Sequence, residues 1–457
     1  MKFLGLIVLF FAAAFGSGAE VAVDHIDLST TWAGWLCLVV FVIGYYFIAA
    51  EELYHVNKAK PAIFIGTFMF ILLGIYMAIN SMSMEPLNNE INHLIIEIAQ
   101  IVFFLMVAMT YIEALIERDV FNVLKYNLVS KGYSYKKLFW LTGVIAFFLS
   151  PVADNLTTAL ILSTVLLTID RENKAFLVTG AINIVVAANA GGAWSPFGDI
   201  TTLMVWAAGK SPFIDFLALF PASFIGWIIT GYLLSLKVPE GSPRFDVKSE
   251  KKVVIKPGGK VVIALGISTI VIAVLCHQFF HLPAMWGMMF GFSLLTIFSY
   301  LFKKKHKDED TMNVFHYMSK IENDTLLFFF GILAAVGALH YAGFLEYLIK
   351  LYDSFGFTSI NIAVGFVSAI VDNVPVMSAV LKSNPAMGDD EWLLVTLTAG
   401  IGGSMISFGS AAGVGVMGKL RGIYTFGAHM SQAWKVVVGY IISLVIWYIQ
   451  FEILGWY

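Results

Sequence analysis

Two polar motifs occur twice in this chain, each time inside a long apolar run, and this duplication constrains the fold more than any other feature. The first motif contains Asp154 and recurs 218 residues later around Asp372, as SPVADN and SAIVDN. The second begins at Gly191 and recurs 211 residues later at Gly402, as GGAWSPFGD and GGSMISFGS. Interrupted hydrophobic segments that repeat in the same order are typical of membrane proteins built from two related halves with a binding site between them.

The composition places the chain in a membrane. Of its 457 residues, 59% are hydrophobic and only 13% are charged, and the mean hydropathy is +0.82, whereas a soluble protein carries about 25% charged residues. Apolar runs near 20 residues long can cross a bilayer as helices, so we predict an all-α polytopic protein surrounded by lipid, with no nucleic-acid partner. The predicted spans are 33–50, 61–80, 92–116, 138–169 (a pair), 175–208 (interrupted), 214–236, 261–279, 284–302, 325–345, 357–382 (a pair), 391–418 (interrupted) and 433–454.

Residues 1–19 have the features of a secretory signal peptide. Lys2 is followed by an apolar run from Phe3 to Phe15 and then by small residues up to Ala19, which is the pattern of a cleavable export signal. The alternative is that this segment stays attached as a first helix. We predict cleavage near Ala19.

The distribution of positive charge predicts the orientation of the chain, because basic residues favour the cytoplasmic side of a membrane. If 138–169 and 357–382 are re-entrant hairpins, which leave the membrane on the side they entered, 24 of the 28 Lys and Arg residues fall on one face. The loops on that face are 51–60, 117–137, 170–174, 237–260, 303–323 and 419–435. We therefore predict that this face is cytoplasmic.

This orientation makes the two halves inverted copies of each other. The first half, 20–236, enters the membrane from outside, and the second, 261–457, enters from the cytoplasm after a basic linker at 237–260. Each half contains one hairpin and one interrupted helix, the latter at 175–208 and 391–418. The hairpin around Asp154 is predicted to open to the cytoplasm and the one around Asp372 to the exterior. Inverted repeats of this kind are common in secondary transporters.

Serine and proline predict where the helices restart in the first half. Ser150-Pro151 and Ser195-Pro196 read as an N-cap followed by the first helical residue, so we predict helix starts at Ser150 and Ser195. Non-helical backbone at membrane depth survives only where protein buries it or water lines it. Carbonyl and hydroxyl oxygens at such breaks are available to small cations.

The side chains at these breaks are those that bind hard cations. Asp154, Asp199 and Asp372 supply carboxylates. Further amide and hydroxyl oxygens come from Asn155, Asn189, Thr201, Thr202 and Asn373. Hard cations take oxygen ligands, and these segments offer no thiolate or imidazole cluster for zinc or copper. We predict a Na⁺ (or Li⁺) site at Asp154, Asn155, Asp199, Thr202 and Asn373, and no cofactor besides the transported ions.

A desolvated carboxylate can hold either a proton or a metal ion. Burial raises the pKa of an aspartate above its value near 3.9 in water, by several units in extreme cases, so such a group is protonated unless a cation compensates its charge. Na⁺ and H⁺ then compete for the same oxygens, and alternating exposure to the two sides of the membrane turns competition into antiport. Asp324 and Thr325 open the span after the loop 303–323, and they either belong to the ion pathway or simply start a helix.

At these residues the chain resembles the NhaD-type Na⁺/H⁺ antiporters of the ion transporter superfamily. The resemblance lies in SPVADNLTTALILSTVLL, NAGGAWSPFGDITTLMVW, VSAIVDNVPVMSAVL and GGSMISFGSAAGVGVMG, and it covers essentially the whole chain after the signal region. It implies a bacterial inner-membrane antiporter, without enzymatic activity, that exchanges Na⁺ or Li⁺ for protons. The related dicarboxylate transporters imply a homodimer. By similarity, the important polar positions are Asp154, Asn155, Asn189, Asp199, Thr201, Thr202, Asp324, Thr325, Ser368, Asn373, Ser407 and Ser410.

Three other functions compete with antiport. A Na⁺-coupled symporter of dicarboxylates or other anions, from the same superfamily, should carry little negative charge at its site, whereas this chain places three aspartates at or near its breaks. An intramembrane aspartyl protease needs two facing aspartates, but the segment ending at Asp199 lacks the Gly-x-Gly-Asp pattern. A passive channel would not need titratable groups in inverted repeats.

Overall fold

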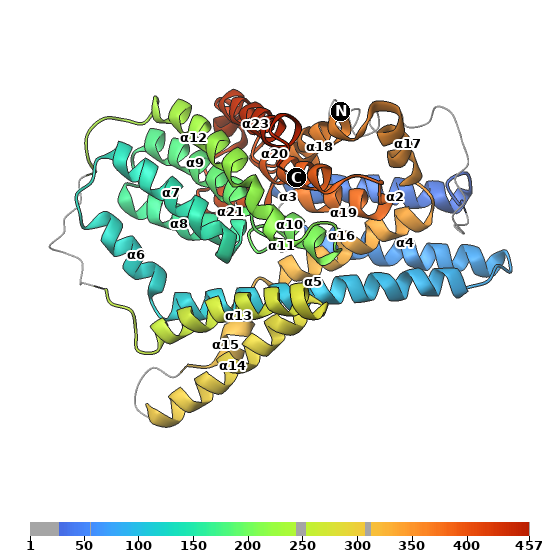
Figure 1. Cartoon of the computed structure of the whole chain (residues 1–457), viewed down its shortest axis with the longest axis horizontal. Coiled ribbons are helices and arrows are strands. Elements are labelled where there is room, and N and C mark those ends of the chain that lie inside the picture. The colour runs from blue at the N-terminus through green and yellow to red at the C-terminus, as the bar shows by residue number, and fades with distance from the viewer. Residues whose placement is uncertain (1–26, 55, 244–252, 307–311, 457) are drawn as a thin grey trace. The chain divides into compact units, whose positions relative to one another are not determined.

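The computed structural model describes residues 27–54, 56–243, 253–306 and 312–456, and every regular element among them is a helix (Figure 1). Ten helices in these ranges are long and apolar enough to cross a membrane. The all-α polytopic fold predicted from the composition is therefore confirmed. The predicted signal peptide, residues 1–19, lies outside the described residues.

The helices belong to two compact units. Unit 1 contains Glu322–Ile360, Pro375–Met387 and the described residues up to Val102. Unit 2 contains Phe103–Ile321, Asn361–Val374 and the described residues from Gly388 onward. Three helices, α5, α18 and α19, contribute residues to both units.

In unit 1, helix α4 packs against both α2 and α16. A Cβ atom on Gly66 of α4 would lie 2.3 Å from the carbonyl oxygen of Gly331 in α16, so glycine allows these two helices to approach backbone to backbone. The helices of unit 1 are α2 (Trp32–Ala49), α3 (Glu51–Tyr54), α4 (Ala59–Ile79), the first part of α5 (Glu85–Glu117), α16 (Asn323–Tyr341), α17 (Glu346–Phe355) and most of α19 (Asn373–Ser383).

Unit 2 contains both interrupted helices and the first predicted hairpin. Its helices are the rest of α5, α6 (Val120–Val129), α7 (Tyr135–Ala153), α8 (Asn155–Ile169), α9 (Lys174–Gly192), α10 (Ile200–Ala207), α11 (Phe213–Phe216), a 3₁₀ turn (Leu217–Leu219), α12 (Phe220–Ser235), α13 (Gly259–Phe280), α14 (Ala284–Lys305), α15 (Val314–Lys320), most of α18 (Phe357–Val371), α20 (Asp389–Gly402), α21 (Ala411–Lys419), α22 (Phe426–Met430), α23 (Ala433–Tyr448) and a π-helical turn (Ile449–Ile453). Helices α7 and α8 pack against α9, and α21 packs along α8 (Figure 1).

The predicted pairs and interruptions are confirmed as helix boundaries. The segment 138–169 forms α7 and α8, and 357–382 forms α18 and α19. The interrupted spans form α9 with α10 and α20 with α21. Polar side chains start several of these helices: Ser134 accepts a hydrogen bond from Lys137 N at the start of α7. N-caps of this kind satisfy backbone N–H groups that have no partner within the helix.

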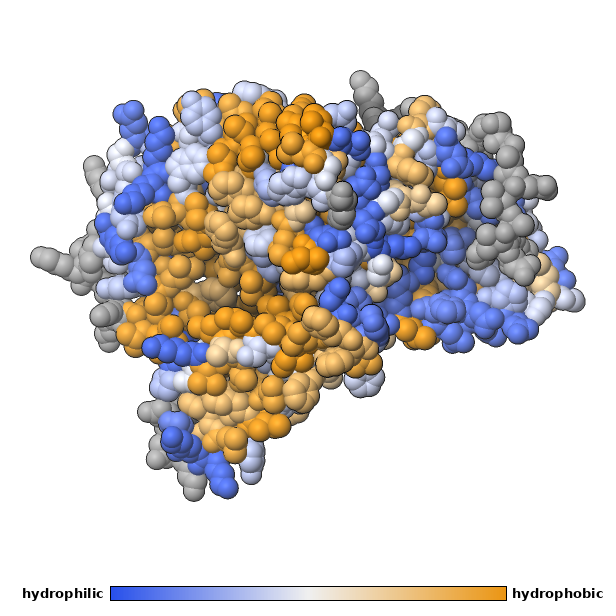
Figure 2. Space-filling view, viewed as in Figure 1, coloured by the Kyte–Doolittle hydropathy of each residue, from blue (hydrophilic) through white to orange (hydrophobic). Residues whose placement is uncertain are grey.

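Helices α13 and α14 expose a largely apolar surface, and hydrophilic residues gather at the far end of α14 (Figure 2). In the span of α13 only 22% of residues are buried, and in that of α14 only 33%. Phe279, Phe280 and Trp286 are among the large side chains that are more than half exposed. A surface of this composition is suited to the hydrocarbon core of a bilayer.

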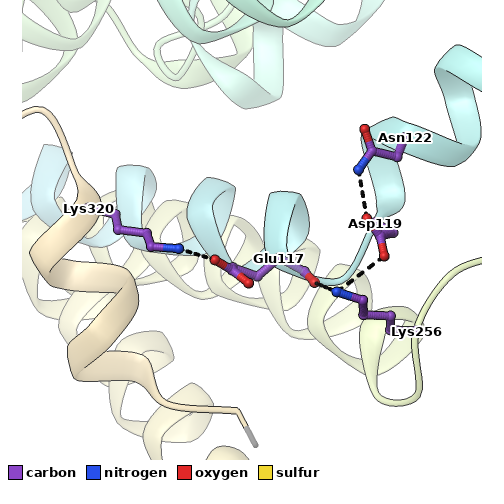
Figure 3. Close-up of polar contacts among 5 residues, drawn as sticks. All are labelled: Glu117, Asp119, Asn122, Lys256 and Lys320. Atoms are coloured by element: carbon purple, nitrogen blue, oxygen red, sulfur yellow. Dashed lines mark hydrogen bonds and ion pairs between the residues drawn. The ribbon is translucent and has the colours of Figure 1, made fainter. Parts of the chain in front are cut away.

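At the end of α5, polar contacts connect this helix to the segments before α13 and in α15 (Figure 3). Lys320 of α15 forms an ion pair with Glu117. Lys256 donates to the backbone carbonyl of Glu117 at 3.1 Å and lies 3.3 Å from a carboxylate oxygen of Asp119, which also accepts a hydrogen bond from Asn122 at 2.6 Å. The hydrogen bond to Glu117 raises the pKa of Lys320. These groups are partly exposed, so each ion pair stabilises the protein only weakly.

Candidate ion-binding site

The tips of the two predicted hairpins have the same backbone geometry. Asp154 separates α7 from α8 with φ 58° and ψ 163°, and Asp372 separates α18 from α19 with φ 66°. Positive φ is uncommon for residues other than glycine, and such conformations cost about 1–3 kcal/mol each. The same costly turn therefore stands at the aligned aspartate of both copies of the first motif.

Each hairpin is also connected to its broken helix by the same hydrogen bond. Ser150 Oγ donates to the carbonyl oxygen of Ala188 at 2.6 Å, and Ser368 Oγ donates to that of Ala399 at 2.6 Å. The serines are 218 residues apart and the carbonyls 211, which are the spacings of the sequence motifs. The predicted site residue Ser368 therefore has a structural contact in this arrangement.

Glycines allow these hairpins and broken helices to touch. A Cβ atom on Gly191 would lie 2.3 Å from the carbonyl oxygen of Phe147, and one on Gly402 would lie 2.2 Å from that of Gly365. Side-chain carbon atoms do not approach backbone this closely, so any larger residue would force the helices apart. The first glycine of each Gly-Gly pair is thus required by packing.

The prediction that helices restart at Ser150 and Ser195 is wrong. Helix α7 continues through Ser150 and Pro151 to Ala153, and α10 begins only at Ile200. Asp154 and Asp199 are the N-caps of α8 and α10. The hydroxyl groups of both serines donate to backbone carbonyls of neighbouring segments and do not cap a helix. Aspartate is as strong an N-cap as serine, and here it occupies that position in both breaks.

Asp199 is a buried carboxylate fixed at the start of α10. Only 4% of the residue is exposed, and its side chain accepts a hydrogen bond from Thr201 N at 3.3 Å. Thr202 holds the backbone around it, because its hydroxyl accepts from Asp199 N at 3.3 Å and donates to the carbonyl of Ser195 at 2.8 Å. A buried charge is costly unless other groups compensate it.

Asparagines from both hairpin tips converge on this carboxylate. Asn155, the first residue of α8, donates to Asp199 Oδ2 at 2.9 Å and to Asn189 Oδ1 at 3.0 Å. Asn373, the first residue of α19, donates to Asp199 Oδ2 at 2.9 Å and to Oδ1 at 3.2 Å. The structure therefore brings together four of the predicted site residues, and Asp199 lies at their centre.

Asn189 extends this cluster to the second broken helix. Its amide nitrogen donates to Ser404 Oγ at 2.8 Å and to Ser410 Oγ at 2.9 Å. Ser410 caps α21, accepting from Gly413 N at 3.3 Å, and it stands 211 residues after Asp199 in the aligned motif. The second break thus contributes a hydroxyl at the position where the first contributes a carboxylate.

Three buried hydroxyl groups lie on the same elements. Thr201, Ser407 and Thr158 are fully buried, and their oxygens have no hydrogen-bond partner among the described residues. Thr158 is one turn after Asn155 on α8, so both project from one face of the helix. Each hydroxyl has lone pairs available to a cation or a water molecule.

Asp372 is the second buried carboxylate of this region. It is 8% exposed, accepts a hydrogen bond from the backbone N–H of Asn373 at 2.8 Å, and lies close enough to Asp199 for the two carboxylates to interact electrostatically. Asp154 differs, because its carboxylate accepts from the backbone N–H and the hydroxyl of Thr157, both at 2.8 Å. The two hairpin-tip aspartates therefore have different surroundings.

Asp324 and Thr325 belong to unit 1 and make local contacts there. Asn57 donates to Asp324 Oδ2 at 2.6 Å, and the hydroxyl of Thr325 donates to Glu322 at 3.0 Å. Both lie in the first turn of α16. These contacts are those expected at the start of a helix, which was one of the two alternatives.

Sequence reasoning missed Ser404 and Thr158. Ser404 holds Asn189, but its aligned position in the first motif is Ala193, so the duplication gave no reason to select it. Thr158 follows Asn155 by three residues, and helical spacing from a predicted site residue was the signal that could have found it.

Comparison with known proteins agrees with this geometry. Residues 45–400 match the family model CitMHS, citrate transporter. The chain is 39% identical to the Na⁺/H⁺ antiporter NhaD of Alkalimonas amylolytica, covering 96% of this chain and 95% of that protein. It is 40% identical to the NhaD of Vibrio cholerae serotype O1, covering 92% of each. The chain belongs to the NhaD family of Na⁺/H⁺ antiporters. A more distant relative is sodium/proton antiporter 1 of Arabidopsis thaliana, which is 33% identical over 83% of this chain and 66% of its own length.

Proposed function

We propose that this protein is a secondary active Na⁺/H⁺ antiporter, in which Na⁺ (or Li⁺) and H⁺ compete for Asp199. NhaD antiporters at 38–42% identity over most of the chain support the exchange reaction. The observation that carries the site assignment is the buried Asp199 carboxylate, which accepts hydrogen bonds from the tips of both hairpins.

Burial makes the charge of Asp199 the basis of the exchange. An isolated carboxylate in an apolar environment is strongly disfavoured, so it must be neutralised by a proton or compensated by a cation. A hard cation such as Na⁺ binds oxygen atoms, and carboxylate, amide and hydroxyl oxygens surround this position. One carboxylate cannot carry a proton and bind the cation at once, so each ion displaces the other.

Asn155 and Asn373 are suited to both ionic states of the site. In the structure their N–H groups point at the carboxylate oxygens of Asp199. An asparagine amide also carries an oxygen with two lone pairs. Rotation about the last side-chain bond would present that oxygen to a cation in place of the N–H donors. The same two residues can therefore stabilise a bare carboxylate or complete the shell of a bound Na⁺.

The two hairpins and broken helices form inverted repeats in this proposal. The same serine hydrogen bond, glycine contact and positive-φ aspartate recur in both halves, which supports a common origin. The hairpin at Asp154 opens to the cytoplasm and that at Asp372 to the exterior of a bacterial inner membrane, as the basic loops indicate. Alternating access then exposes Asp199 to each side in turn and exports sodium. The homodimer implied by the family resemblance stays a prediction.

The decisive experiment compares Asp199→Asn with wild type in everted membrane vesicles. Addition of Na⁺ or Li⁺ should collapse the proton gradient in wild-type vesicles, reported by a ΔpH-sensitive dye, and should have no such effect with Asp199→Asn at any pH from 6 to 9. Asp353→Asn is a matched control, because Asp353 is an exposed residue of α17. Normal exchange by Asp199→Asn would contradict the assignment.

Na⁺-coupled anion symport is the alternative, and the citrate-transporter description of the family model is the observation that keeps it in view. The relatives that cover most of the chain are Na⁺/H⁺ antiporters, so this alternative is not favoured. Proteoliposomes should show no Na⁺-stimulated uptake of labelled citrate or succinate. Such uptake at a rate comparable with Na⁺/H⁺ exchange would reverse the preference.

A further inference from the structure

The second break, residues 403–410, packs against the short helix α22. His429 of α22 is fully buried, and its Nε2 lies 3.1 Å from the carbonyl oxygen of Met405. Its Nδ1 lies 2.6 Å from the hydroxyl of Tyr424. Phe426, at the start of α22, stacks on Phe408 with ring centroids 5.7 Å apart. Helix α22 thus contacts the break at two points.

The partners of His429 define which nitrogen carries its proton. A backbone carbonyl can only accept a hydrogen bond, so Nε2 must carry the hydrogen that is donated to Met405. In a neutral ring Nδ1 is then an acceptor, and the hydroxyl of Tyr424 donates to it. Burial lowers the pKa of His429 to about 4, which keeps the ring neutral near physiological pH.

The first break is held in a different way. There Ser195 donates a hydrogen bond to the carbonyl oxygen of Pro151 at 3.0 Å. The residue 211 positions later is Ile406, whose side chain cannot form a hydrogen bond. The contact between His429 and the neighbouring Met405 carbonyl provides the second break with a side-chain hydrogen bond from a later segment.

We propose that His429 is a positioning residue for the ion site and acts through the backbone of the second break. By fixing the carbonyl of Met405, it keeps the adjacent Ser404 hydroxyl within 2.8 Å of the Asn189 amide. Asn189 accepts a hydrogen bond from Asn155, which contacts Asp199. His429 therefore sets the apparent Na⁺ affinity without touching the ion. This role rests on the proposed function.

Two isosteric substitutions separate the contacts of His429. His429→Gln places an amide N–H near the position of Nε2 and can still donate to Met405. His429→Asn reaches only as far as Nδ1, so it keeps a partner for Tyr424 but loses Met405. We expect His429→Asn to raise the KM for Na⁺ roughly fivefold to tenfold, the effect of losing one hydrogen bond. His429→Gln should stay within about twofold of wild type on the same scale, and the maximal rate per transporter should change little in either variant.

A double-mutant cycle with Ser404→Ala tests the route. If His429 acts through Ser404, His429→Asn should have little further effect on KM when Ser404 is already alanine. An undiminished effect in that background, or an unchanged KM in His429→Asn alone, would overturn the proposal. Failure of both His429 variants to reach the membrane, while Ser404→Ala does, would assign the residue to folding and also overturn it. A wild type without Na⁺/H⁺ exchange would instead refute the proposed function on which this role depends.

Discussion

Replacing Asn373 by alanine should weaken Na⁺ binding without removing the charge that binds it. Asn373 is buried, and its amide lies 2.9 and 3.2 Å from the two carboxylate oxygens of Asp199. A contact between an amide and a charged group contributes about 1.5–3 kcal/mol, and each 1.4 kcal/mol is a tenfold change in affinity. We therefore expect the KM for Na⁺ to rise roughly tenfold to one-hundredfold in Asn373→Ala. The measurement is the Na⁺ dependence of proton-gradient collapse in everted vesicles at fixed pH.

Ser383→Ala provides the matched control on the same helix. Its hydroxyl donates only locally, to the carbonyl oxygen of Val380 at 2.9 Å, so its loss should leave the KM unchanged. Asn373→Ala should still approach the wild-type maximal rate at saturating Na⁺, because Asp199 is intact. A KM within twofold of wild type, in membranes where Asp199→Asn is inactive, would show that Asn373 is not part of the cation site.

Three further predictions concern stability. Because burial lowers the pKa of His429 to about 4 from an ordinary value of 6.5, its contribution to stability is complete above pH 6.5. Up to about 3 kcal/mol is lost as the pH falls toward 4, so the Tm of purified wild type should fall more between pH 7.5 and 5 than that of His429→Gln. Gly191→Ala should sharply reduce folded protein in membranes, since its Cβ would lie 2.3 Å from a backbone oxygen of α7, whereas Gly418→Ala meets nothing within 4 Å and should be tolerated. Lys320→Gln should leave exchange unchanged and lower the Tm slightly at low salt only, because its ion pair with Glu117 is partly exposed.

Helix positions could be predicted because membrane spans are set by length and hydropathy. The predicted 259–280 region began at 261 and ended at 279, and the predicted 214–236 span corresponds to Phe213–Ser235. The exact breaks could not be located in this way. Serine and proline signal a helix start, but Ser150 donates its hydroxyl to a carbonyl 38 residues away. That tertiary contact outweighs the local capping preference, and Asp154 caps the helix instead.

The residue types of the site could be predicted, but their partners could not. Carboxylates and amides at interrupted spans stand out in the sequence, and Asn155, Asn189, Asp199 and Asn373 do meet. The contact between Asn373 and Asp199 joins residues 174 positions apart. Only the packed helices determine which amide reaches which oxygen. For the same reason the sequence did not reveal His429, whose partner is a backbone carbonyl.

The differences between the two halves explain how a duplicated scaffold can hold a single compensated charge. If both breaks carried an aspartate at the aligned position, two buried carboxylates would contact the same Asn189, which now reaches Ser410 directly and Asp199 through Asn155. Like charges in a low-dielectric interior repel strongly unless each has its own cation. Serine at position 410 removes that repulsion while keeping an oxygen for the amide. The first half thus supplies the charge, and the second supplies neutral groups that fix its geometry.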